Sequence, residues 1–140
     1  MKKVFAVILC LGLCGCASVT AYHRTNQDFK NLGSMYVVQR AEDELHLERI
    51  IADELKQRGY RASSGEKANV PEGVDILVTY ADHWFWDITM YMLSIDIEFR
   101  NKQDQSLIAS GRSYRPSLER RSPAAMIQES LDKILNNSGT

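Results

Sequence analysis

The positions of apolar and polar residues along the chain predict four β-strands. Residues 35–40 (MYVVQR) form a short, mostly apolar run that is typical of a buried strand. Residues 74–86 and 90–100 alternate apolar and polar side chains over much of their length, which indicates the two arms of a long antiparallel hairpin. The turn residues NKQDQ then lead into a third antiparallel strand at 106–115.

Two further segments repeat apolar residues with the spacing of an α-helix. Residues 43–58 form the first, with Asp43 as the N-cap and Gly59 as the stop. Ser122 and Pro123 are typical of the N-cap and first position of a second helix. The apolar positions that define the two helices are Leu47, Ile50, Ile51, Leu55, Ile127, Leu131, Ile134 and Leu135.

The order of these elements is β-α-β-β-β-α, which predicts an α+β fold. Residues 63–73 (SSGEKANVPEG) are rich in turn residues and are expected to form a loop. Each helix must bury its apolar stripe, so both are expected on one face of a single mixed four-stranded sheet. A right-handed crossover through the first helix would set the strand at 35–40 parallel to its neighbour. Residues 35–140 are therefore expected to form a single α+β domain.

The closed end of the hairpin is apolar on both faces, which a sheet of this size does not require. Matching the apolar rows sets Ile76 opposite Phe99 and places the turn at Asp87-Ile88; a slip of two residues keeps the faces. The arm at 74–86 spans roughly 40 Å and the first helix only about 24 Å, so the hairpin outruns its cover unless a bulge near Asp82 folds the end over. This register puts Trp84, Trp86 and Tyr91 on one face and Phe85, Met90, Met92 and Tyr114 on the other.

Two interpretations of this tip remain open. Residues 22–33 could lie across the second face and make the aromatic residues part of the core. Otherwise the tip is an exposed apolar patch, which marks contact with a partner or a membrane. The residues expected in that contact are Trp84, Phe85, Trp86, Met90, Met92 and Tyr114.

Residues 1–15 are typical of a secretory signal peptide. Lys2 and Lys3 precede an apolar run at 4–13, which is too short for a membrane-spanning helix of about 20 residues. The sequence Leu13-Cys14-Gly15-Cys16 resembles a bacterial lipobox, with a small residue directly before Cys16 and an aliphatic residue three positions before it. The resemblance implies that Cys16 becomes the acylated first residue of the mature chain.

Acylation would anchor the chain firmly, because several acyl chains together bind a bilayer far more strongly than one. Ala17 follows the cysteine where an aspartate would favour the inner membrane, so the resemblance implies the outer membrane and the periplasmic side. Residues 16–34 are then expected to be a lipidated tether whose later half docks on the domain.

The composition of the mature chain excludes several classes of function. Cys10 and Cys14 would leave with the signal peptide and Cys16 would be acylated, so no thiol remains for a disulfide, a zinc site or a nucleophile. Removing Lys2 and Lys3 from the 17 basic residues leaves 15 against 18 acidic, a net charge of about −3 that gives no reason to expect a nucleic-acid partner. No metal or cofactor is expected, because the histidines, His23, His46 and His83, lack metal-ligand spacing.

Several segments resemble a family of small bacterial lipoproteins that is known only as a domain of unknown function. They are DFKNLGSMYV, LKQRGYRAS, VDILVTYADHW, WDITMY and ASGRSYRPSLERRSP. The layout is more distantly similar to LptE, LpoB and the TolB amino-terminal domain. These resemblances imply a binding or assembly role by analogy of fold, and they supply no catalytic residues.

Charged residues near the hairpin permit two readings. Arg112, Arg115, Arg120 and Arg121 could form a solvated face that pairs with Asp96, Glu98 and the acidic start of the first helix, or a site for an anionic partner. Asp82 and His83 could form an acid–base pair, although neighbouring residues of a regular strand point to opposite faces.

The preferred hypothesis is a non-catalytic, lipid-anchored periplasmic lipoprotein that acts as a binding or assembly accessory of the cell envelope. It would meet the membrane through Cys16 and an envelope protein through the tip. The alternatives are an envelope enzyme with a site near Asp82, His83 and the arginines, and a structural surface lipoprotein without a specific ligand.

Overall fold

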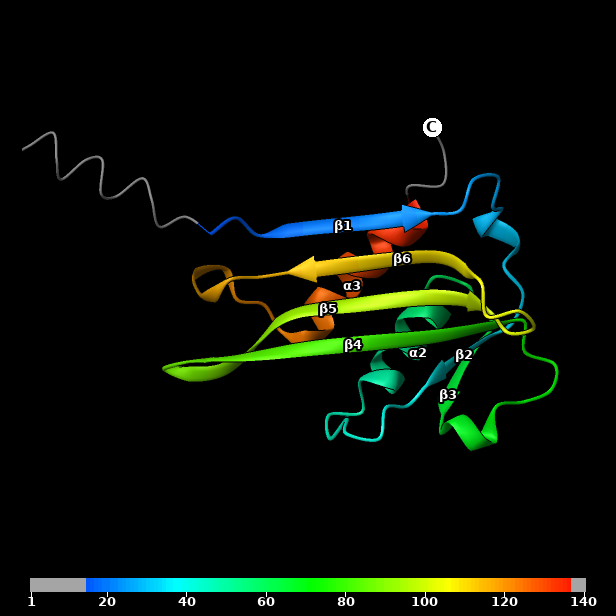
Figure 1. Cartoon of the computed structure of the whole chain (residues 1–140), viewed down its shortest axis with the longest axis horizontal. Coiled ribbons are helices and arrows are strands. Elements are labelled where there is room, and N and C mark those ends of the chain that lie inside the picture. Colours follow the sequence, from blue (N-terminus) through cyan, green and yellow to red (C-terminus); the bar gives the residue numbers. More distant parts are fainter. Residues whose placement is uncertain (1–14, 137–140) are drawn as a thin grey trace, which may run out of the picture.

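A computed structural model describes residues 15–136, which form one six-stranded mixed sheet with two helices packed against it (Figure 1). The strand order across the sheet is β1-β6-β5-β4-β2-β3. The strands are β1 (Ser18–His23), β2 (Met35–Val38), β3 (Ala62–Gly65), β4 (Ile76–Asp87), β5 (Thr89–Asn101) and β6 (Leu107–Tyr114). The helices are α2 (Leu47–Gln57) and α3 (Pro123–Asn136), and short 3-10 turns lie at Phe29–Asn31, Lys67–Asn69 and Ser117–Glu119.

The α+β architecture agrees with the sequence pattern, but the prediction of four strands is wrong. Residues 18–23, expected in a tether, form β1 and pair antiparallel with β6. Residues 62–65, mostly within the expected loop at 63–73, form β3 and pair parallel with β2. Both are short edge strands. The strand β3 (ASSG) consists of small residues, and β1 (SVTAYH) turns only Val19 and Ala21 inward as apolar residues, a weak signal in the sequence. Each of them forms backbone hydrogen bonds with a strand that is already in the sheet, β6 for β1 and β2 for β3. This pairing, and not the pattern of their side chains, makes them strands.

The central strands are arranged as the sequence indicates. The strand β2 is parallel to β4, and the hairpin β4–β5 continues antiparallel into β6. Residues 1–14, which carry most of the expected signal peptide, and residues 137–140 lie outside the described part of the chain. Within residues 15–136, no helix is both long enough and apolar enough to cross a membrane.

Both helices cover the same face of the sheet (Figure 1). The start of α3 is as predicted, with Pro123 in its first position and the Ser122 hydroxyl accepting the Ala125 N–H at 3.2 Å. The start of α2 lies at Leu47 and not at Asp43. The Asp43 carboxylate nevertheless accepts the Leu47 N–H at 2.7 Å, so it still satisfies a free donor of the first helical turn.

The hydrophobic core fills the space between the sheet and the two helices. Its largest fully buried side chains come from β2, β5 and both helices, and β4 and β6 add Val78 and Ala109. The large ones are Met35, Leu47, Ile51, Leu55, Met92, Ile95, Ile97, Phe99, Met126, Ile127, Leu131 and Ile134. The helix α3 packs closely on β6 at Gly111, where a Cβ would lie 2.7 Å from Ile134 Cγ1 and 2.8 Å from Ser130 Oγ. Only glycine leaves room for this contact.

The register of the long hairpin differs from the predicted one. Val78 lies opposite Phe99 and Tyr80 opposite Ile97, a slip of two residues that keeps the apolar faces together. The register then shifts between His83 and Trp84, where a β-bulge leaves Leu93 without a partner on β4. The bulge exchanges the faces of β5 beyond this point, which decides which side chains the hairpin tip presents.

Candidate functional site

The closed end of β4–β5 projects past the rest of the sheet (Figure 1). Beyond the bulge, Trp84 pairs with Met92, Phe85 with Tyr91 and Trp86 with Met90. Met92 thereby faces the helices and is 1% exposed, so its predicted place in an exposed contact is wrong. Tyr91 takes the opposite face with Phe85, and the two rings meet edge to face at 6.1 Å.

Four residues of the β4–β5 hairpin and one residue of the loop after β6 expose large apolar side chains to solvent. We call this set the apolar tip. Its members and their exposed fractions are Phe85 54%, Trp86 66%, Ile88 87%, Met90 56% and Leu118 87%. Residues 22–33 do not cover these side chains. The sequence interpretation in which that segment buries them is therefore wrong for the described structure.

Ile88 forms the turn of the hairpin in an unusual backbone conformation. Its φ is 63°, in the left-handed region that a β-branched residue rarely adopts. Glycine or asparagine is the common choice at such a position. An exposed isoleucine here is disfavoured by the backbone and gains nothing from packing, so the needs of the monomer fold do not explain it.

The loop after β6 holds the tip in place through Arg120. Its guanidinium donates to the Thr89 hydroxyl at 2.6 Å and to the Asp87 carbonyl at 2.6 Å. The same group lies 4.3 Å from the centre of the Tyr91 ring, and the Ser117 hydroxyl donates to the Asp87 carboxylate. The hairpin end is thus braced by a second segment although it buries little apolar surface of its own.

The predicted arginine cluster is divided among separate partners. Arg115 binds Glu129 of α3 at 2.7 Å, and Arg121 approaches the same carboxylate at 3.2 Å. Arg112 lies 3.7 Å from Asp96 on the sheet, whereas Arg120 braces the tip. The expected pairing with Asp96 is present for Arg112. The other predicted partner, the acidic start of the first helix, is not used by Arg115 and Arg121, which pair with Glu129 of α3.

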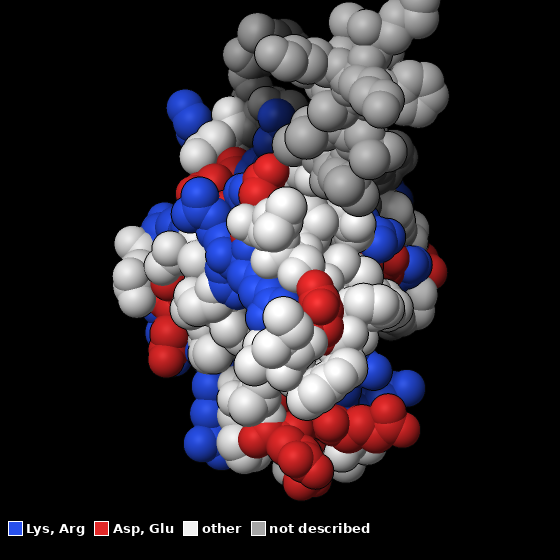
Figure 2. Space-filling model, turned by 90° about the vertical axis from the view of Figure 1, so that its left-hand side faces the viewer, with Lys and Arg blue, Asp and Glu red and all other residues white. Residues whose placement is uncertain are grey.

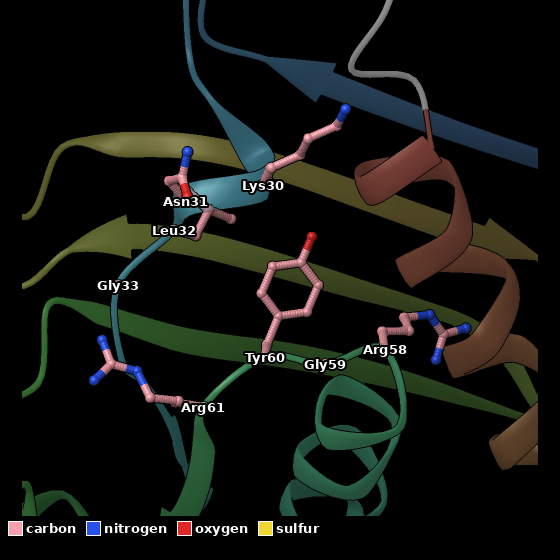
Figure 3. Close-up of a pocket in the computed structure, with 8 residues that line it drawn as sticks. All are labelled: Lys30, Asn31, Leu32, Gly33, Arg58, Gly59, Tyr60 and Arg61. Carbon is pink, nitrogen blue, oxygen red and sulfur yellow. The ribbon is translucent and has the colours of Figure 1, made fainter.

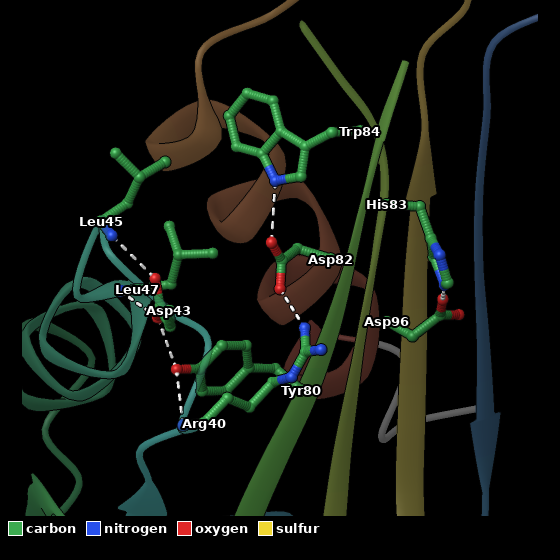
Figure 4. Close-up of polar contacts among 9 residues, drawn as sticks. All are labelled: Arg40, Asp43, Leu45, Leu47, Tyr80, Asp82, His83, Trp84 and Asp96. Atoms are coloured by element: carbon green, nitrogen blue, oxygen red, sulfur yellow. Dashed lines mark hydrogen bonds and ion pairs between the residues drawn. The ribbon is translucent and has the colours of Figure 1, made fainter.

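The structure separates Asp82 from His83, as Figure 4 shows. Asp82 accepts hydrogen bonds from Arg40 and, at 2.7 Å, from the Trp84 indole. His83 points to the other face, where its Nε2 lies 3.8 Å from Asp96. The two residues therefore do not form an acid–base pair with each other.

A buried network next to Asp82 has a structural role. The Tyr80 hydroxyl donates to the Asp43 carboxylate at 2.5 Å, which also accepts the N–H groups of Leu45 and Leu47 (Figure 4). Burial, and then the hydrogen bond to Asp43, raises the pKa of Tyr80 well above its ordinary value. A phenol held neutral in this way fastens the entry of α2 to the sheet and is a poor proton donor.

A shallow hollow on another side of the molecule is basic. It has a volume of about 610 Å³ and is lined by Lys30, Asn31, Leu32, Gly33, Arg58, Gly59, Tyr60 and Arg61 (Figure 3). Arg58 is already bound to Glu54 and Asp132 at 2.5 Å and 2.7 Å, and the Tyr60 hydroxyl donates to the Phe29 carbonyl. The lining contains no carboxylate, histidine, serine or cysteine that could act as a base or nucleophile. Within residues 15–136, no group of three or more acidic, histidine or cysteine side chains is placed to hold a metal ion.

The predicted acylation site lies at the same end of the molecule as the apolar tip. Cys16 is exposed and lies two residues before β1, whose first residue pairs with Tyr114 at the end of β6. A Cβ on Gly15 would lie 3.5 Å from Pro116, next to the Ser117 that binds the hairpin turn. Figure 2 faces this end and shows uncharged residues across the middle of the surface, with both basic and acidic residues around them.

Part of the apolar tip was predictable from the sequence. Phe85, Trp86 and Met90 are exposed at the tip as expected, whereas Trp84 and Tyr114 are partly buried beside it. Ile88 and Leu118 were not among the contact residues predicted from the sequence. Their signal was present, because an apolar residue at a hairpin turn and another in a polar loop are both out of place.

Comparison with known proteins shows a likeness of fold. No protein-family model matches the chain, and no curated protein matches it in sequence. The PelC dodecamer from Paraburkholderia phytofirmans aligns with a TM-score of 0.64 at 15% identity, over 86% of this chain and 99% of that chain. A DUF4136 family protein from Bacteroides thetaiotaomicron aligns with a TM-score of 0.54 at 10% identity, over 84% and 93% of the two chains.

A third structure, a PDZ domain protein from Parabacteroides distasonis, aligns with a TM-score of 0.56 at 10% identity, over 89% of this chain and 36% of that chain. The DUF4136 match supports a resemblance to a family of unknown function, and these matches do not support LptE, LpoB or TolB. The chain is thus similar in fold, at low sequence identity, to PelC and to a DUF4136 family protein.

Proposed function

We propose that this chain is a non-catalytic lipoprotein of the outer membrane, anchored by acylated Cys16 and facing the periplasm. It acts as a binding or assembly accessory of the cell envelope, and the apolar tip is its contact surface. The observation that carries the proposal is the apolar tip itself, a braced hairpin end with exposed aromatic and aliphatic side chains. Such a surface is costly for a protein that contacts nothing else.

Two further observations support this role. Both Asp82 and Tyr80 have their polar groups engaged in structural hydrogen bonds, which favours binding over catalysis as the function of this region. The PelC neighbour is a dodecamer, so a similar fold supports a large assembly in another protein. We also propose that the chain is related to small outer-membrane lipoproteins of a domain-of-unknown-function family.

The anchor is tested by Cys16→Ser in the full chain. We expect the substitution to abolish incorporation of a clickable fatty acid and to leave an uncleaved precursor, because the sulfur is the acyl acceptor. The measurement is in-gel fluorescence of cells grown with the labelled fatty acid. Undiminished label on the variant would remove the lipoprotein proposal.

The contact surface is tested by a photo-crosslinking residue in place of Trp86 in the anchored full chain. Irradiation of intact cells should yield adducts at this position, because the side chain would be covered by whatever the tip contacts. The matched control places the same residue at Tyr22, which is 53% exposed at the far end of β1. Equal adduct yields at the two positions would contradict a contact specific to the tip.

A further inference from the structure

We propose that the apolar tip is embedded in the phospholipid surface to which acylated Cys16 attaches the chain. The inference rests on the proposed function, because it needs the lipid anchor, and it identifies the contact of the tip as the bilayer itself. It starts from the observation that the anchor and the tip lie at one end of the molecule (Figure 1).

The strand pairings allow the reach of the tip to be compared with that of the anchor. Successive pairings put four residues in one row across the sheet: Ser18, Tyr114, Ser94 and His83. From this row the chain extends by two residues to Cys16 and by four residues to Asp87. At about 3.3 Å per residue, these positions lie roughly 7 Å and 13 Å beyond the row. The tip therefore reaches roughly 6 Å deeper than the cysteine, within the depth of about 5–10 Å at which interfacial segments bury apolar groups.

The exposed apolar side chains of the described residues gather at this end. Apart from Tyr22, the large ones are the apolar tip and Leu45, which lies beside Trp84 around a shallow hollow. Trp86 and Met90 follow one face of the hairpin, Phe85 follows the other, and Ile88 occupies the turn. A protein partner would have to enclose this protrusion on all sides. A fluid bilayer surrounds an inserted hairpin without a preformed pocket.

The side chains around the tip suit the boundary between headgroups and acyl chains. Tryptophan prefers this boundary, and arginine can bind phosphate while its stem lies along apolar groups. Arg121 is about half exposed beside the tip, and Arg120 is already fixed over Tyr91. Of the acids at the tip, Asp87 lies 3.7 Å from Arg120 and Glu119 lies 3.6 Å from Arg115. Glu42 and Glu44, which line the hollow beside Leu45, are exposed to solvent. The strained, exposed Ile88 has a use in this setting, because its side chain would be the deepest apolar group.

The chain provides its own reporter for the test. Trp84 and Trp86 are its two tryptophans, and Trp84 is partly buried with its indole bound to Asp82. The acylated full-length protein is reconstituted into vesicles of phosphatidylethanolamine and phosphatidylglycerol whose acyl chains are brominated near the headgroups. Tryptophan emission is compared with that in unbrominated vesicles. Bromine quenches only indoles that enter the bilayer, so we expect emission to fall by up to about half, the share of one of the two indoles.

Two variants make the result specific. Trp86→Phe keeps an apolar side chain and should remove most of the quenching. Tyr22→Trp in the Trp86→Phe background puts an exposed indole at the far end of β1 and should not restore it. If Trp86 is not quenched, or if the indole at position 22 is quenched as strongly, the tip is not embedded and the inference is overturned.

The outcomes separate this inference from the proposed function. Mass spectrometry of the same sample measures the acyl chains on Cys16. An acylated, vesicle-bound protein with unquenched Trp86 overturns the lipid contact alone and leaves the tip to a protein partner. A protein without acyl chains overturns both proposals.

Discussion

Asp43 and Asp75 each use a carboxylate to hold a loop against the rest of the fold. Asp43 accepts from the start of α2 and from Tyr80 on β4. Asp75 accepts the Ser34 N–H at 2.7 Å and the Ser34 hydroxyl at 3.1 Å, which ties the entry of β2 to the entry of β4. At the residue scale, polar side chains join segments that are about 40 residues apart in sequence.

Replacement of Asp75 by asparagine should change how stability depends on acid. The hydrogen bonds from the N–H and then the hydroxyl of Ser34 lower the pKa of Asp75. Because the folded pKa lies below the unfolded value of about 3.9, this contribution is complete above that pH and is lost as the pH falls through the folded pKa. The free energy of unfolding, measured with urea at a series of pH values, should therefore fall less steeply below about pH 4 in Asp75→Asn than in the wild type.

Ser34→Ala serves as the companion variant, since it keeps the carboxylate and removes only the hydroxyl donor. It should reproduce part of the flattening. If the free energy of unfolding of Asp75→Asn fell with acid as steeply as that of the wild type, the hydrogen bonds from Ser34 would not lower the pKa of Asp75 in the folded state.

At the scale of elements, the close contact between α3 and β6 and the β-bulge in the β4–β5 hairpin determine how the helices and strands pack. The helix α3 reaches β6 because Gly111 has no side chain, and the bulge at His83 and Trp84 sends Met92 into the core. The brace from Arg120 and Ser117 then holds the hairpin end against the loop after β6. Each of these features depends on two elements that meet only in the folded chain.

Gly111→Ala tests the closest of these contacts. The added methyl would fall 2.7–2.9 Å from Ile134 and Ser130, so the helix must move or the core must strain. We expect the free energy of unfolding to fall by about 1–3 kcal/mol, measured by urea denaturation. Gly73→Ala is the matched control, because a Cβ there meets nothing within 4 Å. Equal midpoints for the two variants would contradict the close packing of α3 on β6.

At the scale of the whole molecule, one end carries Cys16, the predicted acylation site, and the apolar tip, while the two helices and the sheet enclose a single core. Stability and surface function are therefore assigned to different parts of the same strands. The strand β5 contributes Ile97 to the core and Met90 to the apolar tip.

A pair of aliphatic truncations measures this division. Ile97 is fully buried, so Ile97→Ala should lower the free energy of unfolding by about 2–5 kcal/mol. Leu118 is 87% exposed, and Leu118→Ala should leave the urea midpoint nearly unchanged. A large loss of stability in Leu118→Ala would show that the apolar tip belongs to the core of the monomer.

Features that arise from local periodicity could be predicted from the amino-acid sequence. The alternation in β4, β5 and β6, the helical spacing in α2 and α3, and the cap at Ser122 are each encoded within one element. The exposed aromatic residues Phe85 and Trp86 were also predictable, because the hairpin is longer than its cover. The resemblance of Cys16 to a lipobox cysteine likewise needs only neighbouring residues.

Features that depend on pairing between distant segments appear only in the folded chain. The edge strands β1 and β3 form because a strand already in place offers free hydrogen-bonding groups, and their own short sequences do not show that this partner is near. One extra residue at the bulge moves Met92 from the surface into the core, since side chains alternate with a period of two. The pairing of β1 with β6 brings Cys16 to the end that carries the apolar tip, because the direction of a strand is set by its partner and not by its own residues.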